Sequence, residues 1–415
     1  MGRSEMGRNG NAGAVVVRQP QDHELDALAS VVEDAFMFRF SPEERERFLA
    51  GIEPARSLVV AEGPAIVGTL LSYLTELTVP GPVLAPVAAL TDIAVSPTKR
   101  GRGHLGRLLG RFFLDAHKRG EHLALLDASE GGLYGRYGFG PATWSATYRL
   151  ARGTPRLASA EVTGPGDLVV LRADEARASL PAVFEDWRRS SVGEVPRAAP
   201  AWDELLEQDK ASGRARFVVV HAPAGLIDSY AIYDARPNGH ELSLHLVELV
   251  AGSDAGYREL WRYLVALAGA GGLESGPRPT EEAARHLLGD VRALFQQELR
   301  DRSWLRLLDV AAALDLRRYQ GAGALRCSVR DEQCPWNAGS FVLEVDADGH
   351  AEVTPTKRAA DLELSAADLA TAYLGATSFA TLVRAGRVLE VTSGAAVRAD
   401  RLFGADRPPF QSAEL

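Results

Sequence analysis

The sequence predicts an α+β chain built from three consecutive modules, and three observations support this. The 415 residues exceed what one ordinary core holds, so two or three domains are expected. The order of strands and helices expected over residues 14–150 recurs over residues 151–291. From about Arg292 the order changes, which predicts a third α+β module over residues 292–415.

The first module is predicted from apolar strands that alternate with amphipathic helices. It follows a leader of residues 1–13, which is expected to be disordered because it holds no apolar periodicity. The helix expected over residues 103–119 has a continuous apolar face. The expected strands are 15–18, 58–62, 66–77, 87–95, 123–128 and a final strand at 148–150; the expected helices are 24–38, 43–49 and 103–119.

The second and third modules are predicted in the same way. A Pro-, Gly-, Ser- and Thr-rich stretch from residue 151 to about 164 predicts a linker. The second module then has expected strands at 167–172, 215–221, 229–234 and 243–250 and helices at 182–189, 201–211 and 257–267. The third has expected strands at 303–309, 325–330 and 339–345 and helices at 310–317, 365–374 and 379–385.

Composition excludes several classes of protein. The net charge of −9 speaks against a nucleic-acid binder and suits a small cationic substrate. Two cysteines, Cys327 and Cys334, cannot form a zinc site alone, so we expect no metal and free thiols in a reducing cytoplasm. No window of eighteen apolar residues occurs, so no membrane span is expected.

The stretch from Thr91 to Gly106 has the clearest chemical meaning. A β-rich run ends at Pro97, passes into a basic turn with spaced glycines, and then opens the amphipathic helix. Unpaired N–H groups at a helix N-terminus bind phosphate oxygens, and glycines allow the main chain to approach them. Arg100 and Arg102 can add charge-assisted hydrogen bonds. The alternative is a solvated basic turn that only caps the helix.

The string from Arg100 to Leu105 fits the pattern R-x-x-G-x-[G/A/L]. It resembles the acetyl-CoA loop of the GNAT superfamily of N-acetyltransferases. In that fold the splayed strand, here Ile93–Val95, offers backbone N–H groups to the acyl oxygen. An ordinary central strand satisfies the same sequence, so this assignment is not exclusive.

The glycine-rich run from Ala128 to Pro141 supplies a candidate proton donor. Acetyl transfer from a thioester needs a weak acid near the departing sulfur. A phenol of pKa about 10 can protonate a thiolate whose conjugate acid lies near about 8.5. Tyr134 is preferred because the glycines around it have no packing purpose of their own. Alternatively, Tyr134 and Tyr137 are packing aromatics, and Ser129 forms a turn and does not bind the pantetheine arm.

The run from Ser129 to Thr143, S-E-G-G-L-Y-G-R-Y-G-F-G-P-A-T, resembles the signature of the enhanced intracellular survival (Eis) acetyltransferases. Further matches extend the resemblance over nearly the whole chain: 77–81, 202–206, 260–262, 285–288 and 309–314. The resemblance implies tandem GNAT folds, the first active and the second degenerate, followed by a sterol-carrier-protein-like domain. It also implies a homohexamer that acetylates aminoglycosides at several amines.

The same resemblance implies roles for individual residues. Tyr134 is the expected general acid, and the terminal carboxylate at Leu415 the expected general base. The expected coenzyme A site consists of Ile93, Ala94, Val95, Arg100, Gly101, Arg102, Gly103, His104, Leu105, Gly106 and Ser129. The expected substrate pocket includes Phe36, Phe38 and Glu414.

Two departures from the family pattern affect these expectations. The final residue is leucine and not aromatic, which changes how the chain end is anchored. Phe38 or Met37 stands where the family has an acidic pocket residue, which weakens polyamine binding. Phe36, Phe38 and Glu414 can also be plain core aromatics and a surface acid. Two other functions stay open: acetylation of protein lysines or polyamines, and a non-catalytic lipid carrier.

Overall fold

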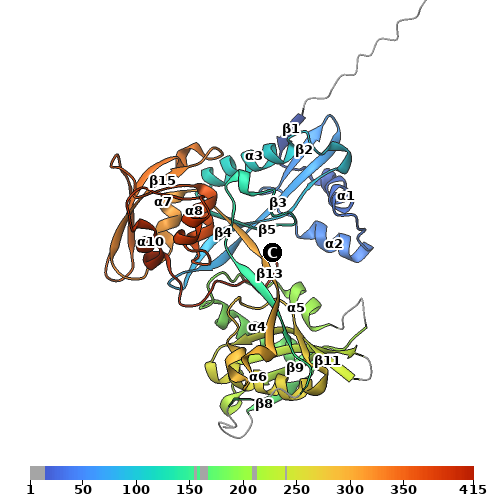
Figure 1. The fold of residues 1–415 in the computed structure, drawn as a ribbon. Coiled ribbons are helices and arrows are strands. Elements are labelled where there is room, and N and C mark those ends of the chain that lie inside the picture. Colours follow the sequence, from blue (N-terminus) through green and yellow to red (C-terminus); the bar gives the residue numbers. More distant parts are fainter. Residues whose placement is uncertain (1–14, 154–156, 159–166, 208–212, 239–240) are drawn as a thin grey trace, which may run out of the picture.

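The computed structural model describes residues 15–153, 157–158, 167–207, 213–238 and 241–415. The expected leader at 1–13, and the expected linker from residue 154 onward except residues 157–158, lie outside the described residues. In the described part of the chain the strands form three sheets, two of seven strands and one of five. Figure 1 shows three lobes, one around each sheet, which meet near the centre of the molecule. The structure therefore confirms a mixed fold with three modules.

The first sheet has the order β1-β2-β3-β4-β5-β14-β6. Its strands are β1 (Val15–Arg18), β2 (Leu58–Glu62), β3 (Ala65–Val79), β4 (Val83–Val95), β5 (Leu123–Asp127), β6 (Gly140–Pro141) and β14 (Ser303–Leu307). Its helices are α1 (Leu25–Phe36), α2 (Pro42–Ala50) and α3 (His104–Lys118). The expected apolar face of α3 is buried through Leu108, Leu109, Phe112 and Phe113. Burial of this face is the main reason why the segment is helical.

The second sheet has the order β13-β7-β12-β11-β10-β9-β8. Its strands are β7 (Trp144–Leu150), β8 (Leu168–Leu171), β9 (Phe217–His221), β10 (Ser229–Asn238), β11 (Glu241–Ala251), β12 (Leu273–Ser275) and β13 (Leu294–Asp301). Its helices are α4 (Ala173–Arg188), α5 (Ala199–Leu206) and α6 (Asp254–Ala268). The expected start of α4 at residue 182 was wrong, because Pro181 lies inside the helix and does not begin it.

Two strands cross between the first and second sheets. The expected last strand of the first module, β7, lies in the second sheet between β13 and β12. The strand expected to open the third module, β14, lies in the first sheet between β5 and β6. Both positions differ from the sequence expectation, because a period of two reveals a strand but not its partner. The boundaries expected at residues 150 and 291 stay predictions.

The third sheet has the order β17-β16-β15-β18-β19. Its elements are β15 (Gly323–Arg330), β16 (Gly339–Val345), β17 (Ala351–Pro355), β18 (Leu362–Ser365) and β19 (Leu389–Glu390), with α7 (Val310–Leu316), α8 (Ala366–Tyr373), α9 (Phe379–Arg384) and α10 (Ala395–Phe403). A buried ion pair of 2.6 Å, Arg306–Asp331, joins this module to β14. Cys327 and Cys334 are both buried and free.

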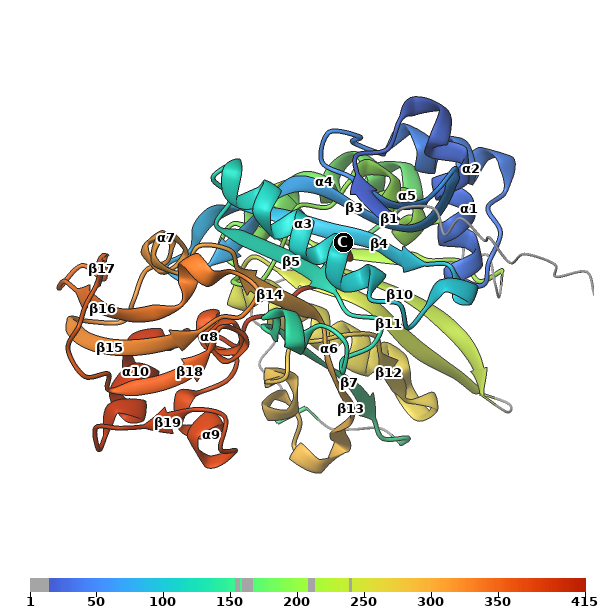
Figure 2. The same ribbon diagram turned by 90° about the horizontal axis from the view of Figure 1, so that it is seen from above.

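The segment of residues 410–415 lies at the junction of the modules. Viewed from two directions, the C-terminal label stands beside β4 and β5 (Figures 1 and 2). Phe410, Gln411 and Ala413 are buried there. None of the helices in the described parts of the chain is long and apolar enough to cross a membrane.

Candidate active site

An opening between β4 and β5 forms the centre of the candidate site. These parallel strands pair only at Ala88–Ala124 and Ala89–Leu125. Further along, β4 continues beside β3, while β5 pairs with β14 as far as Asp127. The ladder between the two strands therefore ends before their carboxyl ends, and this place is called the opening below. Such ends are where ligands bind in sheets of this kind.

A bulge in β4 lies on the edge of this opening. The register against β3 runs from Thr69–Ala94 to Leu71–Thr91, so Asp92 and Ile93 face the single residue Leu70. Asp92 has a φ of 47°, which is rare for a residue other than glycine. A bulge of this type leaves one residue without a ladder partner. Of the strand residues expected to meet the acyl group, Ile93 thus lies in the bulge, and Ala94 and Val95 follow it.

The turn of residues 100–106 that leads into α3 fits a phosphate ligand, and it is called the phosphate turn below. Gly101 and Gly103 both have a φ of 76°, and nothing lies within 4 Å of where a Cβ would stand at either residue. Gly103 precedes the first turn of α3, and the first hydrogen bond of the helix runs from the Arg107 amide to its carbonyl. The amides of residues 104–106 therefore lack partners within the helix. Open space and unpaired donors are what a diphosphate group needs.

The basic side chains of this turn are held by neighbouring elements. Glu62 of β2 contacts Lys99, Arg102 at 3.8 Å and His104 at 3.2 Å. The Lys99 ammonium lowers the pKa of the Glu62 carboxyl. The His104 side chain is buried, so only its backbone can face a ligand. Arg100 donates to the Ala35 carbonyl over 3.1 Å, which ties the turn to the end of α1.

Tyr134 is positioned by the short 3₁₀ turn Gly135–Tyr137. Its side chain is 5% exposed, and burial raises its pKa to about 12. It shares one hydrophobic cluster with Ile93, Leu105 and the apolar face of α3. A Cβ at Gly106 would lie 3.4 Å from the Tyr137 hydroxyl, so the tyrosine turn rests on the first turn of α3. The structure thus brings Tyr134 together with the strand and the phosphate turn. Ser129 is exposed nearby in sequence.

Two carboxylates in the opening were missed by the sequence analysis. Asp92 comes from β4 and Asp127 from the end of β5. Burial raises the pKa of both, partly offset by the Thr91 hydroxyl at Asp92 and by Arg302 at Asp127. Burial raises the pKa of Tyr73 on β3, and the charges of Asp127 and Asp92 raise it further, so both acids lie within electrostatic range of that hydroxyl. A lone acid closing an apolar strand, as in Leu123–Asp127, is a sequence signal for Asp127, whereas Asp92 stands inside β4 and has no such signal.

The remaining predicted residues lie at two edges of the site. The Leu415 amide donates to Asp127 Oδ2 over 3.4 Å, and Glu414 lies 3.5 Å from Arg302. Phe36 is the last residue of α1 and Phe38 lies two residues beyond it; they are 45% and 39% exposed. They neighbour Ala35, which Arg100 contacts. Arg100 thus connects the turn to the end of α1, where Phe36 stands.

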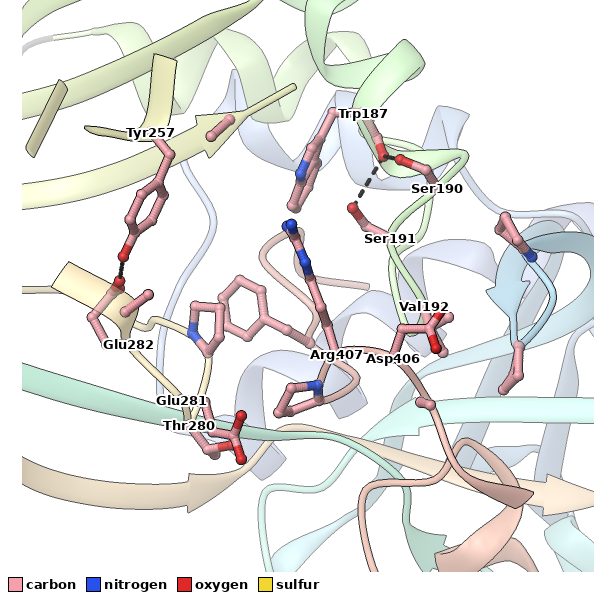
Figure 3. Close-up of a pocket in the computed structure, with 18 of the residues that line it drawn as sticks. Trp187, Ser190, Ser191, Val192, Tyr257, Thr280, Glu281, Glu282, Asp406 and Arg407 are labelled. Atoms are coloured by element: carbon pink, nitrogen blue, oxygen red, sulfur yellow. Dashed lines mark hydrogen bonds between the residues drawn. The ribbon is translucent and has the colours of Figure 1, made fainter. Parts of the chain in front are cut away.

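A separate cavity of about 1080 Å³ lies between the modules and includes none of the predicted site residues. Its wall includes Trp187, Tyr257 and residues 404–408. Figure 3 shows Arg407 extending toward Trp187, and the Tyr257 hydroxyl donating to Glu282. The segment that leads to Leu415 therefore passes this cavity before it reaches the opening.

Comparison with protein families finds three domain matches along the chain. Residues 16–142 and residues 193–307 each match an acetyltransferase (GNAT) domain. Residues 310–412 match a sterol carrier protein domain. The opening between β4 and β5, the phosphate turn and Tyr134 all lie in the first of these matches.

Relatives match over nearly the full length. An uncharacterized N-acetyltransferase of Streptomyces avermitilis is 35% identical over 379 residues, covering 89% of this chain and 91% of the relative. N-acetyltransferase Eis of Mycobacterium tuberculosis is 32% identical over 406 residues, covering 95% of this chain and 98% of the relative. The crystal structure of Eis1 from Mycobacterium abscessus superposes with a TM-score of 0.86 at 32% identity, covering 96% and 100% of the two chains.

Proposed function

The chain belongs to the Eis family of GNAT N-acetyltransferases, and from that premise we propose that it acetylates a cationic aminoglycoside at more than one amine. GNAT acetyltransferases use acetyl-CoA, and an N-acetyltransferase acts on an amine. What the proposal adds is the substrate class, the residues that hold it and the groups that move protons.

The observation that carries the substrate class is the carboxylate pair Asp92 and Asp127. Asp127 is the last residue of β5 and Asp92 lies in the bulge of β4, and the charges of both act on Tyr73 of β3. Asp127 reaches solvent, yet surrounding protein removes enough water to raise its pKa. A partly desolvated carboxylate binds an ammonium group more strongly than a fully solvated one. Two such acids on opposite strands suit a substrate with several amines. They supply negative charge that Phe38 or Met37, at the position expected to be acidic, does not supply.

For acetyl-CoA we assign the turn from Arg100 to Gly106 to the diphosphate. Its open glycines and unpaired amides fit that group, and Arg100 and Arg102 add positive charge. Ile93, Ala94 and Val95 are assigned to the acyl end, since the β4 bulge interrupts the ladder beside them. Ser129 is assigned to the pantetheine arm. When bound, acetyl-CoA supplies the acetyl thioester.

Tyr134 is the proposed proton donor. A phenol with a pKa of about 12 keeps its proton at neutral pH, which is the form a donor needs. That pKa lies above the value of about 8.5 for a thiol, so Tyr134 acts first as a hydrogen-bond donor to the departing sulfur. On the amine side, the proposed bases are the Leu415 carboxylate and Asp127. Phe36, Phe38 and Glu414 are proposed to border the substrate.

The test is a thiol-release assay with acetyl-CoA and a panel of aminoglycosides, followed by a mass-spectrometric count of the acetyl groups added. A polyamine and a lysine peptide complete the panel. We expect turnover with the aminoglycosides and more than one acetyl group per molecule. Tyr134→Phe should lower kcat by about a hundredfold, because it removes one positioned proton donor.

Tyr137→Phe is the matched control, because Tyr137 lies in the same turn but packs on Gly106. Its kcat should stay within about twofold of the original protein. Turnover only with the peptide or the polyamine would replace the aminoglycoside by that acceptor. A folded protein without turnover on any amine would contradict the proposal.

A further inference from the structure

The segment of residues 410–415 is held by hydrogen bonds to a loop of the second module, residues 191–195. The Phe410 amide donates to the Val192 carbonyl over 3.0 Å. Two residues later, both the amide and the hydroxyl of Ser412 donate to Glu194 Oε2, over 2.9 and 2.8 Å. The Ala413 amide donates to Glu194 Oε1 over 3.1 Å. One side chain therefore binds two consecutive backbone amides of the segment.

Glu194 is completely buried, and its carboxylate accepts hydrogen bonds from amide and hydroxyl donors. Besides the segment, the Val195 amide donates to Oε1 over 3.3 Å. Arg197 reaches the Ser412 hydroxyl over 3.4 Å, while it is paired with Glu248 at 2.5 Å. Burial raises the pKa of Glu194, and the donors from Ser412 and Ala413 oppose that shift. A buried carboxylate is costly unless such donors satisfy it, so the segment and Glu194 depend on each other.

The loop is shaped for this contact and docked on the first module. Gly193 has a φ of 94°, and a Cβ there would lie 2.8 Å from Thr143 Cγ2 and 3.1 Å from the Phe410 backbone. The Gly193 amide donates to the Thr78 carbonyl over 2.8 Å, and the Thr78 amide donates to the Glu194 carbonyl over 3.0 Å. Thr78 belongs to β3 of the first sheet. The loop of residues 191–195 is thus fixed to the first sheet, which contains the opening.

Beyond Ala413 the segment reaches that opening. Glu414 lies 3.5 Å from Arg302, and the Leu415 amide donates to Asp127 over 3.4 Å. These last two contacts are long and more solvated than those at Glu194, with the Glu414 side chain 81% exposed. Hydrogen bonds of that length in solvent hold a segment poorly. The position of residues 414–415 therefore depends on the buried contacts just before them.

We propose that Glu194 is a positioning residue: the second module uses it to hold residues 412–413, so that residues 414–415 lie beside Asp127 at the opening of the first module. This gives the second module a direct part in the reaction of the first. The inference rests on the proposed function for its effect on rate, but the hydrogen bonds between Glu194 and residues 412–413 can be tested without any substrate.

The experiment compares Glu194→Gln with the original protein by hydrogen exchange of residues 410–415 and by steady-state kinetics. A glutamine amide nitrogen cannot accept, so it opposes one of the donors. We expect the exchange of these residues to become about tenfold faster, as for loss of one charged hydrogen bond. We expect kcat to fall about tenfold while KM for acetyl-CoA stays within about twofold, because the phosphate turn is untouched.

Glu282→Gln is the matched control. Glu282 is also buried in the second module, bonded to Arg278 at 2.9 Å, and makes none of the described contacts with residues 410–415. Glu282→Gln should lower the stability of the second module without changing amide exchange in residues 410–415. Equal acceleration in both variants would overturn the proposal, because a general loss of stability would then explain it. Unchanged exchange in folded Glu194→Gln would overturn it too.

Ser412→Ala is the milder variant, in case Glu194→Gln does not fold. It removes one hydroxyl donor and keeps both amides, so exchange should rise only about threefold. Exchange of the Glu194→Gln, Ser412→Ala double variant should stay within about twofold of Glu194→Gln alone, because the residues act through one contact. If the acceleration of exchange in the double variant equals the product of the accelerations in the two single variants, the residues do not act through one contact. If no amine is acetylated, the proposed function fails, and the exchange data still decide whether Glu194 holds the segment.

Discussion

At the scale of single residues, the candidate site combines a phenol that keeps its proton with a carboxyl group that can lose it. Burial keeps the Tyr134 phenol protonated, with a pKa of about 12. Burial also raises the pKa of Asp127, but this side chain touches solvent and has Arg302 near it. The proposed proton donor and the proposed amine-binding acid therefore stand in different environments. The first belongs to the cluster under α3, and the second to the gap between β4 and β5.

Asp127→Asn tests the acidic side. Because the pKa of Asp127 is raised, its charge is lost at a higher pH than for an ordinary aspartate as the solution is acidified. We expect kcat/KM for the amine to fall with decreasing pH through that range in the original protein. In Asp127→Asn it should be about tenfold to a hundredfold lower at neutral pH and lose this acid limb, as one charged hydrogen bond is removed.

Asp115→Asn serves as the control for this prediction. Asp115 lies on α3 and pairs with Arg111 at 2.7 Å, outside the opening. Its pH profile should match that of the original protein in a stopped assay between about pH 5 and 9. An acid limb that survives in Asp127→Asn would assign it to another group, with Asp92 the next to replace.

Residue types were easier to predict than residue neighbours. Tyr134 and the glycines of the phosphate turn stand in a local run, so their pattern is visible along the chain. Asp92, Asp127 and Glu194 gain their surroundings from strands and loops far away in sequence. No local pattern marks a single acid as buried beside a distant amide. Such sites become visible only once the sheets are assembled.

At the scale of elements, helix α3 joins the phosphate turn to the core. Its apolar face is buried, and its N-terminus is left open by Gly101 and Gly103. Both ends of the helix are flanked by glycine in the left-handed region, with a φ of 76° at Gly103 and 72° at Gly120. Only the first of these glycines faces the space assigned to the diphosphate.

Substitution of these two glycines by alanine separates stability from binding. Each change forces alanine to a positive φ with open space around it, so each should cost about 1 kcal/mol of stability. Calorimetry should show similar losses of Tm for Gly103→Ala and Gly120→Ala. Only Gly103→Ala should raise KM for acetyl-CoA, by about tenfold, because its methyl group stands where the phosphate approaches. Equal KM values in the two variants would remove the turn from cofactor binding.

Element types were predicted better than element ends and partners. β1, β2 and β16 were found at their expected bounds because apolar runs are closed by clear turns. Helix α10 (Ala395–Phe403) and strands β12, β13, β17, β18 and β19 were not expected. Short strands carry too few residues for a period, and α10 lies in a stretch whose charges interrupt the apolar pattern. Partners such as β14 with β5 depend on contacts across nearly two hundred residues, which no window detects.

At the scale of the whole molecule, the crossing strands make one body of the first two modules. β13 lies in the second sheet and the next strand, β14, lies in the first. In the same way β6 lies in the first sheet and the next strand, β7, lies in the second. Thr143, between β6 and β7, donates to or accepts from the Ser303 hydroxyl at 2.6 Å and accepts from the Ser303 amide over 3.0 Å. Neither sheet keeps all its strands if the other unfolds.

We therefore expect the first two modules to unfold as one cooperative unit. Differential scanning calorimetry should show a single transition for both, whose van 't Hoff enthalpy covers more than one module. Thr143→Val should lower the Tm of that transition by about 2 °C or more without splitting it, because it removes a buried link between the sheets. Two separate transitions, one following α3 and one following α6 by hydrogen exchange, would contradict this.

The crossing of β14 also has a consequence for synthesis. A nascent chain emerges from its N-terminus, and β14 (Ser303–Leu307) is made only after about three-quarters of the protein. Until then β5 has an open edge where β14 will pair, and open edges invite aggregation. We expect ribosome-bound chains stopped before residue 303 to recruit chaperones, and chains stopped well beyond residue 307 to release them.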